Sequence, residues 1–194
     1  MKTWLISFIA KYYQRFRVRL YKQLSNNNHI KGSPKHKSPV LYKGKGEIQF
    51  REGVILGYNP SPFFYNSVIY LEARNEDAVI NIGNNTIANN ALSIIADKGL
   101  ISIGNDVLIG SEVFIINSNF HGIHPLERNT GTHECEDVII ENNVFIGSRV
   151  TILKGVKIGE NSIVASGSVV TKKFPKNVII GGNPAQIIKE IDFE

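Results

Sequence analysis

Between residues 82 and 169, isoleucine and valine recur every six residues, a spacing that the 3.6-residue period of an α-helix does not produce. Glycine often stands second in each unit and a small or β-branched residue fifth, as in IGNDVL (103–108) and the unbroken units of 140–169. A short strand followed by a tight corner can turn one aliphatic side chain inward every six residues. Glycine and asparagine at the corners tolerate the positive φ that tight turns need. The pattern therefore predicts repeated strand–corner units.

Three such units close a triangular coil, and stacked coils form parallel strands around one continuous aliphatic core. We predict an all-β parallel β-helix over residues 47–183. The period slips between 93 and 103 and stops at 117–138, where three of the five histidines lie, namely His121, His124 and His133. Insertions in repeat proteins form loops on one face, often the binding face. The segment therefore predicts one large protruding loop that carries chemistry.

The two ends of the chain break the pattern. Residues 1–24 predict a basic amphipathic helix, with Leu5, Ile9, Tyr12, Phe16 and Leu20 on one face and no acid to balance its lysines and arginines. Two interpretations stay open: the apolar stripe packs on its own domain or another subunit, or the helix lies on an anionic membrane surface. Residues 25–46 predict a polar linker, and residues 184–194 predict a short helical cap on the β-helix.

Composition narrows the function classes. The net charge is +5 over 194 residues, but no zinc-finger, helix-turn-helix or aromatic RNA-binding pattern accompanies it, so we expect no nucleic-acid partner. The single cysteine, Cys135, excludes an internal disulfide and favours a reducing, cytoplasmic location. Cys135 is expected to be a buried small side chain, and His133 to face solvent. No apolar run is long enough to span a bilayer.

The hexapeptides together with HGIHPLER (121–128) resemble the left-handed parallel β-helix acetyltransferases, in particular the galactoside, maltose and polysaccharide O-acetyltransferases. The resemblance covers roughly residues 75–191 and is closest over 140–191. It implies a left-handed coil, acetyl-CoA as co-substrate with no metal required, and a homotrimer whose site lies between subunits.

The resemblance also implies roles for single residues. His121 matches the general base, and Ser148 the position that stabilises the oxyanion or contacts the pantetheine. Asn89, Asp97 and His124 match acceptor-binding positions, whereas Ser166, Thr171, Lys172 and Lys189 match positions that bind the cofactor. Gln186 replaces a basic residue of the family.

The resulting prediction is acetyl-CoA-dependent O-acetylation of a sugar hydroxyl or a surface polysaccharide intermediate, in the cytoplasm and at the inner face of the membrane if the helix binds there. The alternative is N-acetylation of an amino sugar on a nucleotide-sugar. Two other interpretations are a β-helix hydratase with three histidines on zinc and a solenoid without enzymatic activity. The hydratase requires a histidine spacing along successive coils that is absent, and it leaves the C-terminal TKK…GGNPA sequence unexplained.

Overall fold

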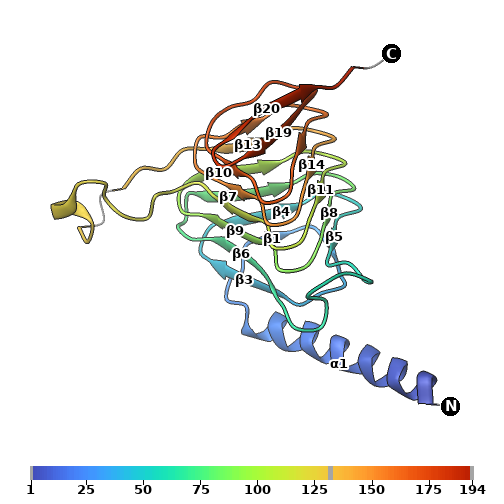
Figure 1. Cartoon of the computed structure of the whole chain (residues 1–194). Coiled ribbons are helices and arrows are strands. Elements are labelled where there is room, and N and C mark those ends of the chain that lie inside the picture. Colours follow the sequence, from blue (N-terminus) through green and yellow to red (C-terminus); the bar gives the residue numbers. More distant parts are fainter. Residues whose placement is uncertain (1, 131–132, 193–194) are drawn as a thin grey trace.

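The computed structural model describes residues 2–130 and 133–192, in which short strands stack into coils around a single axis (Figure 1). In this described part the strands form three sheets. Sheet A consists of β1 (Ile30–Lys31), β4 (Glu47–Phe50), β7 (Ala78–Ile82), β10 (Gly99–Ile103), β13 (Val138–Ile140) and β16 (Lys157–Ile158). Sheet B consists of β2 (Lys35–His36), β5 (Ile55–Leu56), β8 (Ile87–Ala88), β11 (Leu108–Ile109), β14 (Phe145–Ile146), β17 (Ile163–Val164), β19 (Val178–Gly182) and β20 (Ala185–Glu190). Sheet C consists of β3 (Val40–Gly44), β6 (Ile69–Ala73), β9 (Ser93–Ala96), β12 (Phe114–Ile116), β15 (Thr151–Ile152) and β18 (Val169–Val170).

The predicted parallel β-helix is confirmed. From β1 to β18 the chain visits sheets A, B and C in turn, and each of these strands pairs in parallel with its counterpart one coil away, as Ile80 of β7 does with Ile101 of β10. Side chains alternate between inward and outward along the strands of the core, such as β7 and β10, so the first-position aliphatics of successive coils lie on one another. Ile82, Ile103, Ile140 and Ile158 are buried in this core. Burying one such side chain stabilises the fold by roughly 1.5–3 kcal/mol.

The corners between sheets give the site its framework. We call the turns from sheet B to sheet C (89–92, 110–113, 147–150 and 165–168) the BC corner, and those from sheet C to sheet A (97–98, 117–137 and 153–156) the CA corner. The CA corner also includes 171–173, which follow β18 and lead to the isolated bridge of Phe174 with Ile158 of β16. The turns from sheet A to sheet B use asparagine as predicted, because Asn143 and Asn161 have φ of 54° and 60°. The Asn143 Nδ2 donates to Asn161 Oδ1 over 2.9 Å, so these side chains also tie successive coils together.

Two boundary predictions were wrong. The linker predicted at 25–46 contains β1, β2 and β3, so the first coil begins near Ile30. Val40 and Tyr42 point inward there, but the polar outward residues and the prolines between them hide the pattern. The short C-terminal helix is instead β20, which reverses at Gly182–Ala185 and pairs antiparallel with β19. This added strand covers the edge that sheet B would otherwise expose.

The N-terminal helix is confirmed as α1 (Lys2–Leu24), with η1 (Pro125–Glu127) as a single 3-10 turn in the loop. In Figure 1, α1 lies across the N-terminal end of the coil stack. Its predicted apolar stripe does not pack on its own domain, since Ile9 and Phe16 are 58% and 62% exposed. Within residues 2–130 and 133–192, no helix combines the length and the apolarity needed to cross a bilayer.

Candidate active site at the loop and corners

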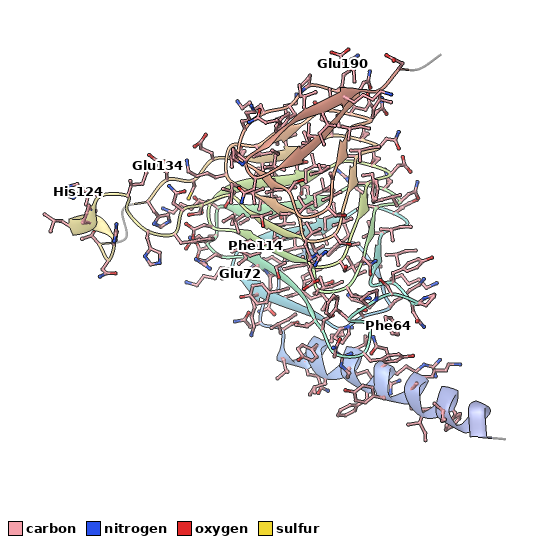
Figure 2. All side chains as sticks on the ribbon, viewed as in Figure 1. Phe64, Glu72, Phe114, His124, Glu134 and Glu190 are labelled. Carbon is pink, nitrogen blue, oxygen red and sulfur yellow. The ribbon has the colours of Figure 1, made fainter. Side chains whose placement is uncertain are left out.

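The predicted loop leaves the CA corner after β12 and extends away from the coils before it returns to β13 (Figures 1 and 2). Its two arms pair at the base, where Glu136 N donates to Asn117 O over 3.0 Å and Asn119 N donates to Glu134 O over 3.1 Å. Beyond this short ladder the loop is exposed, and Leu126 near its tip is 83% exposed. The base of the loop is therefore held by the β-helix, while the described residues 123–130 of its outer part are exposed.

His121 lies on the outgoing arm of the loop with its ring exposed. Its Nδ1 is 2.9 Å from the backbone carbonyl oxygen of Arg128. A carbonyl only accepts hydrogen bonds, so Nδ1 must carry the proton. The neutral ring then has its lone pair on Nε2, which is the atom a general base needs.

His124 has a local role at the tip of the loop (Figure 2). Its Nδ1 accepts a hydrogen bond from Leu126 N over 3.3 Å and so caps η1. His124 is exposed, and the acceptor contact predicted for it stays a prediction.

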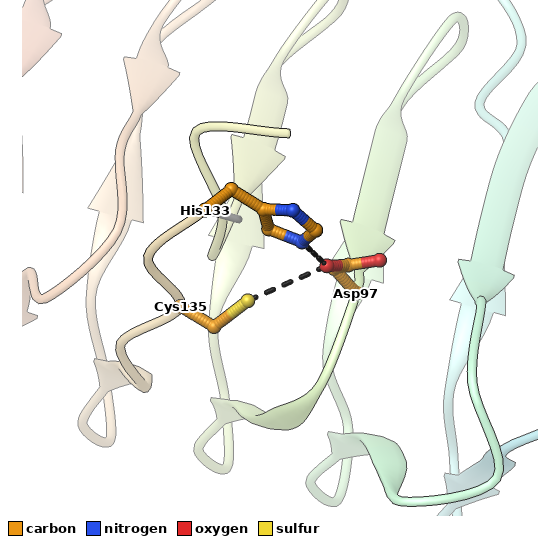
Figure 3. A group of neighbouring side chains, drawn as sticks. All are labelled: Asp97, His133 and Cys135. Carbon is orange, nitrogen blue, oxygen red and sulfur yellow. Dashed lines mark hydrogen bonds and ion pairs between the residues drawn. The ribbon is translucent and has the colours of Figure 1, made fainter. Parts of the chain in front are cut away.

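The expectation that His133 faces solvent was wrong. Its ring is largely buried, and Nε2 donates to the carboxylate of Asp97, as Figure 3 shows. Asp97 is only 3% exposed and also accepts from Ser118 Oγ and from Cys135 Sγ, each over 3.4 Å. Arg74 Nη1 lies 3.8 Å from the same carboxylate. The predicted acceptor contact of Asp97 stays a prediction, whereas the contacts present bind the returning arm of the loop to the coil below.

The charge state of this cluster follows from its contacts. Burial acts to raise the pKa of Asp97, but the hydrogen bonds from His133 and Cys135, with the charges of His133 and Arg74, hold it below its ordinary value. Burial raises the pKa of the Cys135 thiol, so Cys135 stays protonated at neutral pH and is no nucleophile. Asp97 is thus an anion that holds the bottom of the loop through its hydrogen bonds to His133 and Cys135.

Among the described residues, the same three side chains form a group whose atoms are of the kinds that bind metal ions. Asp97 Oδ2, His133 Nε2 and Cys135 Sγ all lie within 4.8 Å of one another. Direct hydrogen bonds from the imidazole and the thiol to one carboxylate oxygen account for this spacing. The three side chains thus satisfy one another through these hydrogen bonds.

Lys154 adds a second clamp and borders a surface hollow. Its Nζ lies 3.0 Å from Glu134 Oε2 and 2.5 Å from Glu136 Oε1, both on the returning arm. Beside it a hollow of about 450 Å³ opens between the loop base and the CA corner. Phe120 lines it from the loop and Thr171 from the C-terminal coil, so the structure brings the predicted cofactor residue Thr171 close to the loop that carries His121.

The BC corner holds another group of predicted site residues. Ser148 and Ser166 occupy equivalent positions one coil apart, and Gly167 N donates to Ser148 O over 2.9 Å. Asn89 lies on the same corner two coils below Ser148, where its Oδ1 accepts from Asn90 N over 2.7 Å. The BC corner and the CA corner lie at opposite ends of the strands of sheet C. Within one chain, Asn89, Ser148 and Ser166 are therefore on a different corner from the loop and Thr171.

The lysines predicted to bind the cofactor lie on the C-terminal coils. Lys172 Nζ donates to Gln186 Oε1 over 2.6 Å and lies 5.5 Å from the centre of the Phe174 ring. Lys189 lies on β20 with Gln186, and both are exposed. The residue that replaces a basic family position thus contacts Lys172 directly.

Sequence reasoning missed the residues that hold the loop: Arg128, whose carbonyl fixes the His121 tautomer, Lys154, and the Asp97–His133 pair. The cluster of charged and histidine residues in THECED marked the segment. It could not reveal a partner 36 residues away on another coil.

The Asp97 cluster predicts a stability effect. Asp97→Asn should lower the free energy of unfolding by about 1.5–3 kcal/mol, the value of hydrogen bonds to a charged group, and should speed amide exchange at the loop base. Because the folded pKa is lowered, this stabilisation is present at neutral pH and is lost as pH falls below about 4, the ordinary value for aspartate. Urea denaturation at pH 7 and at lower pH would measure it.

Glu134→Gln is the matched control, since it makes the same chemical change in an exposed ion pair and should cost less than about 1 kcal/mol. Equal effects of the two substitutions would show that the Asp97 contacts do not hold the loop.

Comparison with known proteins supplies relatives. The family model "Bacterial transferase hexapeptide (six repeats)" matches residues 137–172. The galactoside O-acetyltransferase of Escherichia coli K12 is 42% identical over 113 residues, which is 58% of this chain and 55% of that protein. The matched stretch thus spans about half the length of the galactoside enzymes.

A second relative matches over more of its length. The protein named "Putative lipopolysaccharide biosynthesis O-acetyl transferase WbbJ" of Escherichia coli K12 is 35% identical over 164 residues, which is 80% of this chain and 78% of that protein. Among solved structures, a galactoside acetyltransferase in complex with coenzyme A superimposes with a TM-score of 0.58 at 32% identity, over 79% of this chain and 66% of the other.

Proposed function

The chain belongs to the hexapeptide-repeat acetyltransferases, whose coil is a left-handed parallel β-helix, and from this premise we propose that it transfers the acetyl group of acetyl-CoA to a sugar hydroxyl. The observation that carries the proposal is the hydrogen bond of His121 Nδ1 to the Arg128 carbonyl. It leaves Nε2 free, on an exposed loop, to accept a proton.

The chemistry requires such a base. A sugar hydroxyl becomes nucleophilic only as its proton leaves, and an imidazole can take that proton as the new C–O bond forms. The oxygen attacks the thioester carbonyl, and the resulting oxyanion needs a donor already in place, for which Ser148 is the proposed residue. When the tetrahedral intermediate collapses, the C–S bond breaks, and the proton held by His121 passes to the coenzyme A thiolate. The products are an acetyl ester and free coenzyme A.

The division of site residues between two corners supports a site shared by two subunits. His121, Thr171 and Lys172 come from the CA corner, whereas Asn89, Ser148 and Ser166 come from the BC corner. A neighbouring copy that presented its loop to the BC corner of this one would complete the set. The loop suits this task, because Ile123 and Leu126 near its tip are exposed apolar side chains without a core to enter.

An apolar ladder on sheet B offers the surface for that neighbour. Its members are outward-facing, in register and one coil apart: Ile55, Ile87, Leu108, Phe145, Ile163 and Ile179. At about 4.8 Å per strand the ladder is roughly 24 Å long, and it flanks the BC corner. Head-to-tail contacts close into rings where the rotation between neighbours closes, and a ring of three would be the homotrimer that the family resemblance implies.

The acceptor is proposed to be a glycan or a sugar-containing surface polysaccharide intermediate. One relative is named for galactosides and another for lipopolysaccharide biosynthesis, and the exposed loop leaves room for a large acceptor. We place the reaction in the cytoplasm, with the inner face of the membrane as the place where a lipid-borne acceptor is met. N-acetylation of an amino sugar on a nucleotide-sugar is the alternative, since the same base would serve it.

A thiol-release assay tests the function. The protein is mixed with acetyl-CoA and, in turn, with simple sugars, surface glycans and amino-sugar nucleotides, and free thiol is measured. Release that depends on a sugar or glycan hydroxyl supports the proposal. Release with amino-sugar nucleotides alone would favour the alternative, and the absence of release with every acceptor, together with no acetyl-CoA binding in calorimetry, would contradict both.

Cofactor binding gives a quantitative prediction. Lys172→Ala should raise the KM for acetyl-CoA by roughly five- to thirtyfold, in the range of a lost charge-assisted contact. The value of kcat should change less, because phosphates far from the thioester are bound alike in ground and transition states. Lys157→Ala is the control, since Lys157 lies on the outer face of sheet A with Glu141 as its partner at 2.6 Å. An unchanged KM for Lys172→Ala would place the cofactor elsewhere.

A further inference from the structure

The N-terminal end of the molecule is strongly basic and rich in exposed aromatic side chains. Eleven of the 22 lysines and arginines precede residue 47, but none of the 17 aspartates and glutamates does. In the described part of the chain, no ion pair involves a side chain of α1. This end therefore presents a positive potential that no acid within the same element reduces.

Polar contacts fix how α1 lies on the coils. Gln14 and Arg17 are buried, and Gln14 Nε2 donates to Lys37 O and to Phe64 O over 3.0 Å each. Arg17 Nη1 donates to Phe64 O over 3.1 Å, and Nη2 donates to Ser67 O. At the C-terminal end of the helix, Lys43 Nζ donates to Leu24 O over 3.0 Å. The side of α1 that faces the protein thus combines the buried Gln14 and Arg17 with the half-buried Ala10, Val18 and Tyr21, and it leaves the large apolar side chains of the helix elsewhere.

The apolar stripe consequently faces outward. Its members follow spacings of three and four residues along the helix and are all at least one third exposed: Ile6, Ile9, Tyr13, Phe16 and Leu20. Ile9, Phe16 and Leu20 belong to the stripe predicted from the sequence, whereas the side chain of Leu5 lies outside the described residues. Tyr12, which is also exposed, lies beside the stripe. Aromatic and aliphatic side chains on one face of a helix, with cations on the other faces, are typical of helices that lie in the interfacial region of a bilayer.

A basic groove runs between α1 and the loop at 57–67. It measures about 800 Å³, and the cations that line it are Lys11, Arg15, Arg19 and Lys37. Tyr65 closes its far wall, and Tyr58 in the same loop lies 5.3 Å from the Lys37 Nζ. Tyr58, Phe63 and Tyr65 are themselves exposed. Cations with aromatic side chains beside them suit the phosphate and glycerol region of an anionic lipid surface.

We propose that α1 and the loop at 57–67 form a docking surface for a bilayer that carries anionic headgroups, with the apolar stripe in the interface and the groove cations over lipid phosphates. Charge argues against a second copy of the chain as the occupant, because two such ends would repel each other. A soluble polyanion would neutralise the cations but would leave the apolar side chains of the stripe exposed to water. The helix lies on the membrane in this arrangement and does not cross it.

Docking of this kind extends the proposed function. Its consequence for the acceptor depends on that function being correct. In a ring with parallel coil axes, the three helices would lie at the same end of the assembly, and three weak anchors bind far more tightly than one. An acceptor carried on a lipid would then be confined to the surface on which the enzyme sits. The docking itself does not depend on transferase activity, so each can be tested without the other.

The test is co-sedimentation of the full chain with vesicles of equal parts phosphatidylglycerol and phosphatidylcholine, compared with vesicles of phosphatidylcholine alone. The wild type should bind the anionic vesicles at least tenfold more tightly than the neutral ones, and 0.5 M salt should weaken this binding about tenfold or more, because surface charges are then screened. Ile9→Glu/Phe16→Glu should lower the partition coefficient at least tenfold, since charge cannot enter the apolar interface. Lys11→Glu/Arg15→Glu should lower it on the anionic vesicles.

Ile188→Glu is the matched control, because it makes the same change at an exposed position on β20, at the opposite end of the stack (Figure 1). It should leave partition within twofold. Each variant is also assayed for oligomeric state and for turnover on a soluble acceptor, both of which should match the wild type. Equal binding of all variants, or no binding by an active wild type, would overturn the inference. Loss of the oligomer in Ile9→Glu/Phe16→Glu would also overturn it, since the stripe would then cover another copy.

Discussion

Replacement of His121 by alanine is expected to lower kcat by about 10²–10⁴-fold, the usual contribution of a positioned general base. The affinity for acetyl-CoA should hardly change, because the imidazole acts on the acceptor hydroxyl. The wild-type activity should fall in acid, where a protonated ring cannot accept a proton, and this fall should be absent from the residual activity of the variant. Steady-state kinetics between pH 5 and 9 and calorimetric titration with acetyl-CoA would measure both.

His121→Gln and His124→Ala sharpen the result. Glutamine can keep a hydrogen bond to the Arg128 carbonyl but is no base at neutral pH, so it should be nearly as inactive as alanine. His124→Ala removes the η1 cap and should keep the fall in acid. If His121→Ala were active and His124→Ala were not, the base would be His124. If both were active, the transferase would use a base outside these two histidines.

The repetitive part of the fold could be predicted because its information is local. A buried aliphatic every six residues is required wherever a strand and a corner make one side of a coil, so Ile140 and Ile158 reveal their positions without any knowledge of partners. The asparagines at positive φ, such as Asn143, add the corner chemistry. At Val40 and Tyr42 the same inward alternation exists, but only over one strand among prolines and lysines, and a single strand carries no period.

The ends and the loop depend on contacts that no local pattern records. The Gly–Gly–Asn–Pro segment near residue 182 is compatible with a turn before a helix or with a hairpin. The hairpin forms because β20 can pair with the otherwise unpaired edge of β19. His133 has no hydrophobic neighbours in the sequence, yet its partner Asp97 on the coil below buries it. For α1, the spacing predicted a stripe that shares Ile9, Phe16 and Leu20 with the exposed apolar face. It did not predict the direction of that face, because the contacts of Gln14 and Arg17 with the protein set the orientation of the helix.

Disruption of the apolar ladder is expected to have the second large effect. Leu108→Asp/Phe145→Asp should convert the proposed trimer to monomers and should lower kcat/KM at least about 100-fold, because a charge at the centre of an apolar interface prevents its association. The two side chains are 48% and 47% exposed in the single chain and pair in register on the outer face of sheet B. Their loss removes nothing from the core, so the monomer should stay folded. Light scattering, circular dichroism and the thiol-release assay would report the three quantities.

The control keeps the same positions apolar. Leu108→Met/Phe145→Leu conserves hydrophobicity with a small change in shape, and should keep both the trimer and most of the activity.

The decisive sample is a mixture of two inactive proteins, His121→Ala and a variant with Ser148→Ala. If each site draws His121 from one subunit and Ser148 from the next, trimers that form after mild dissociation and mixing contain some sites with both native residues, and activity returns in part. A site built within one chain would give no recovery, because every chain in the mixture would lack one of the two residues. Active monomers of Leu108→Asp/Phe145→Asp would contradict the shared site from the other direction, since a lone chain keeps the BC and CA corners apart.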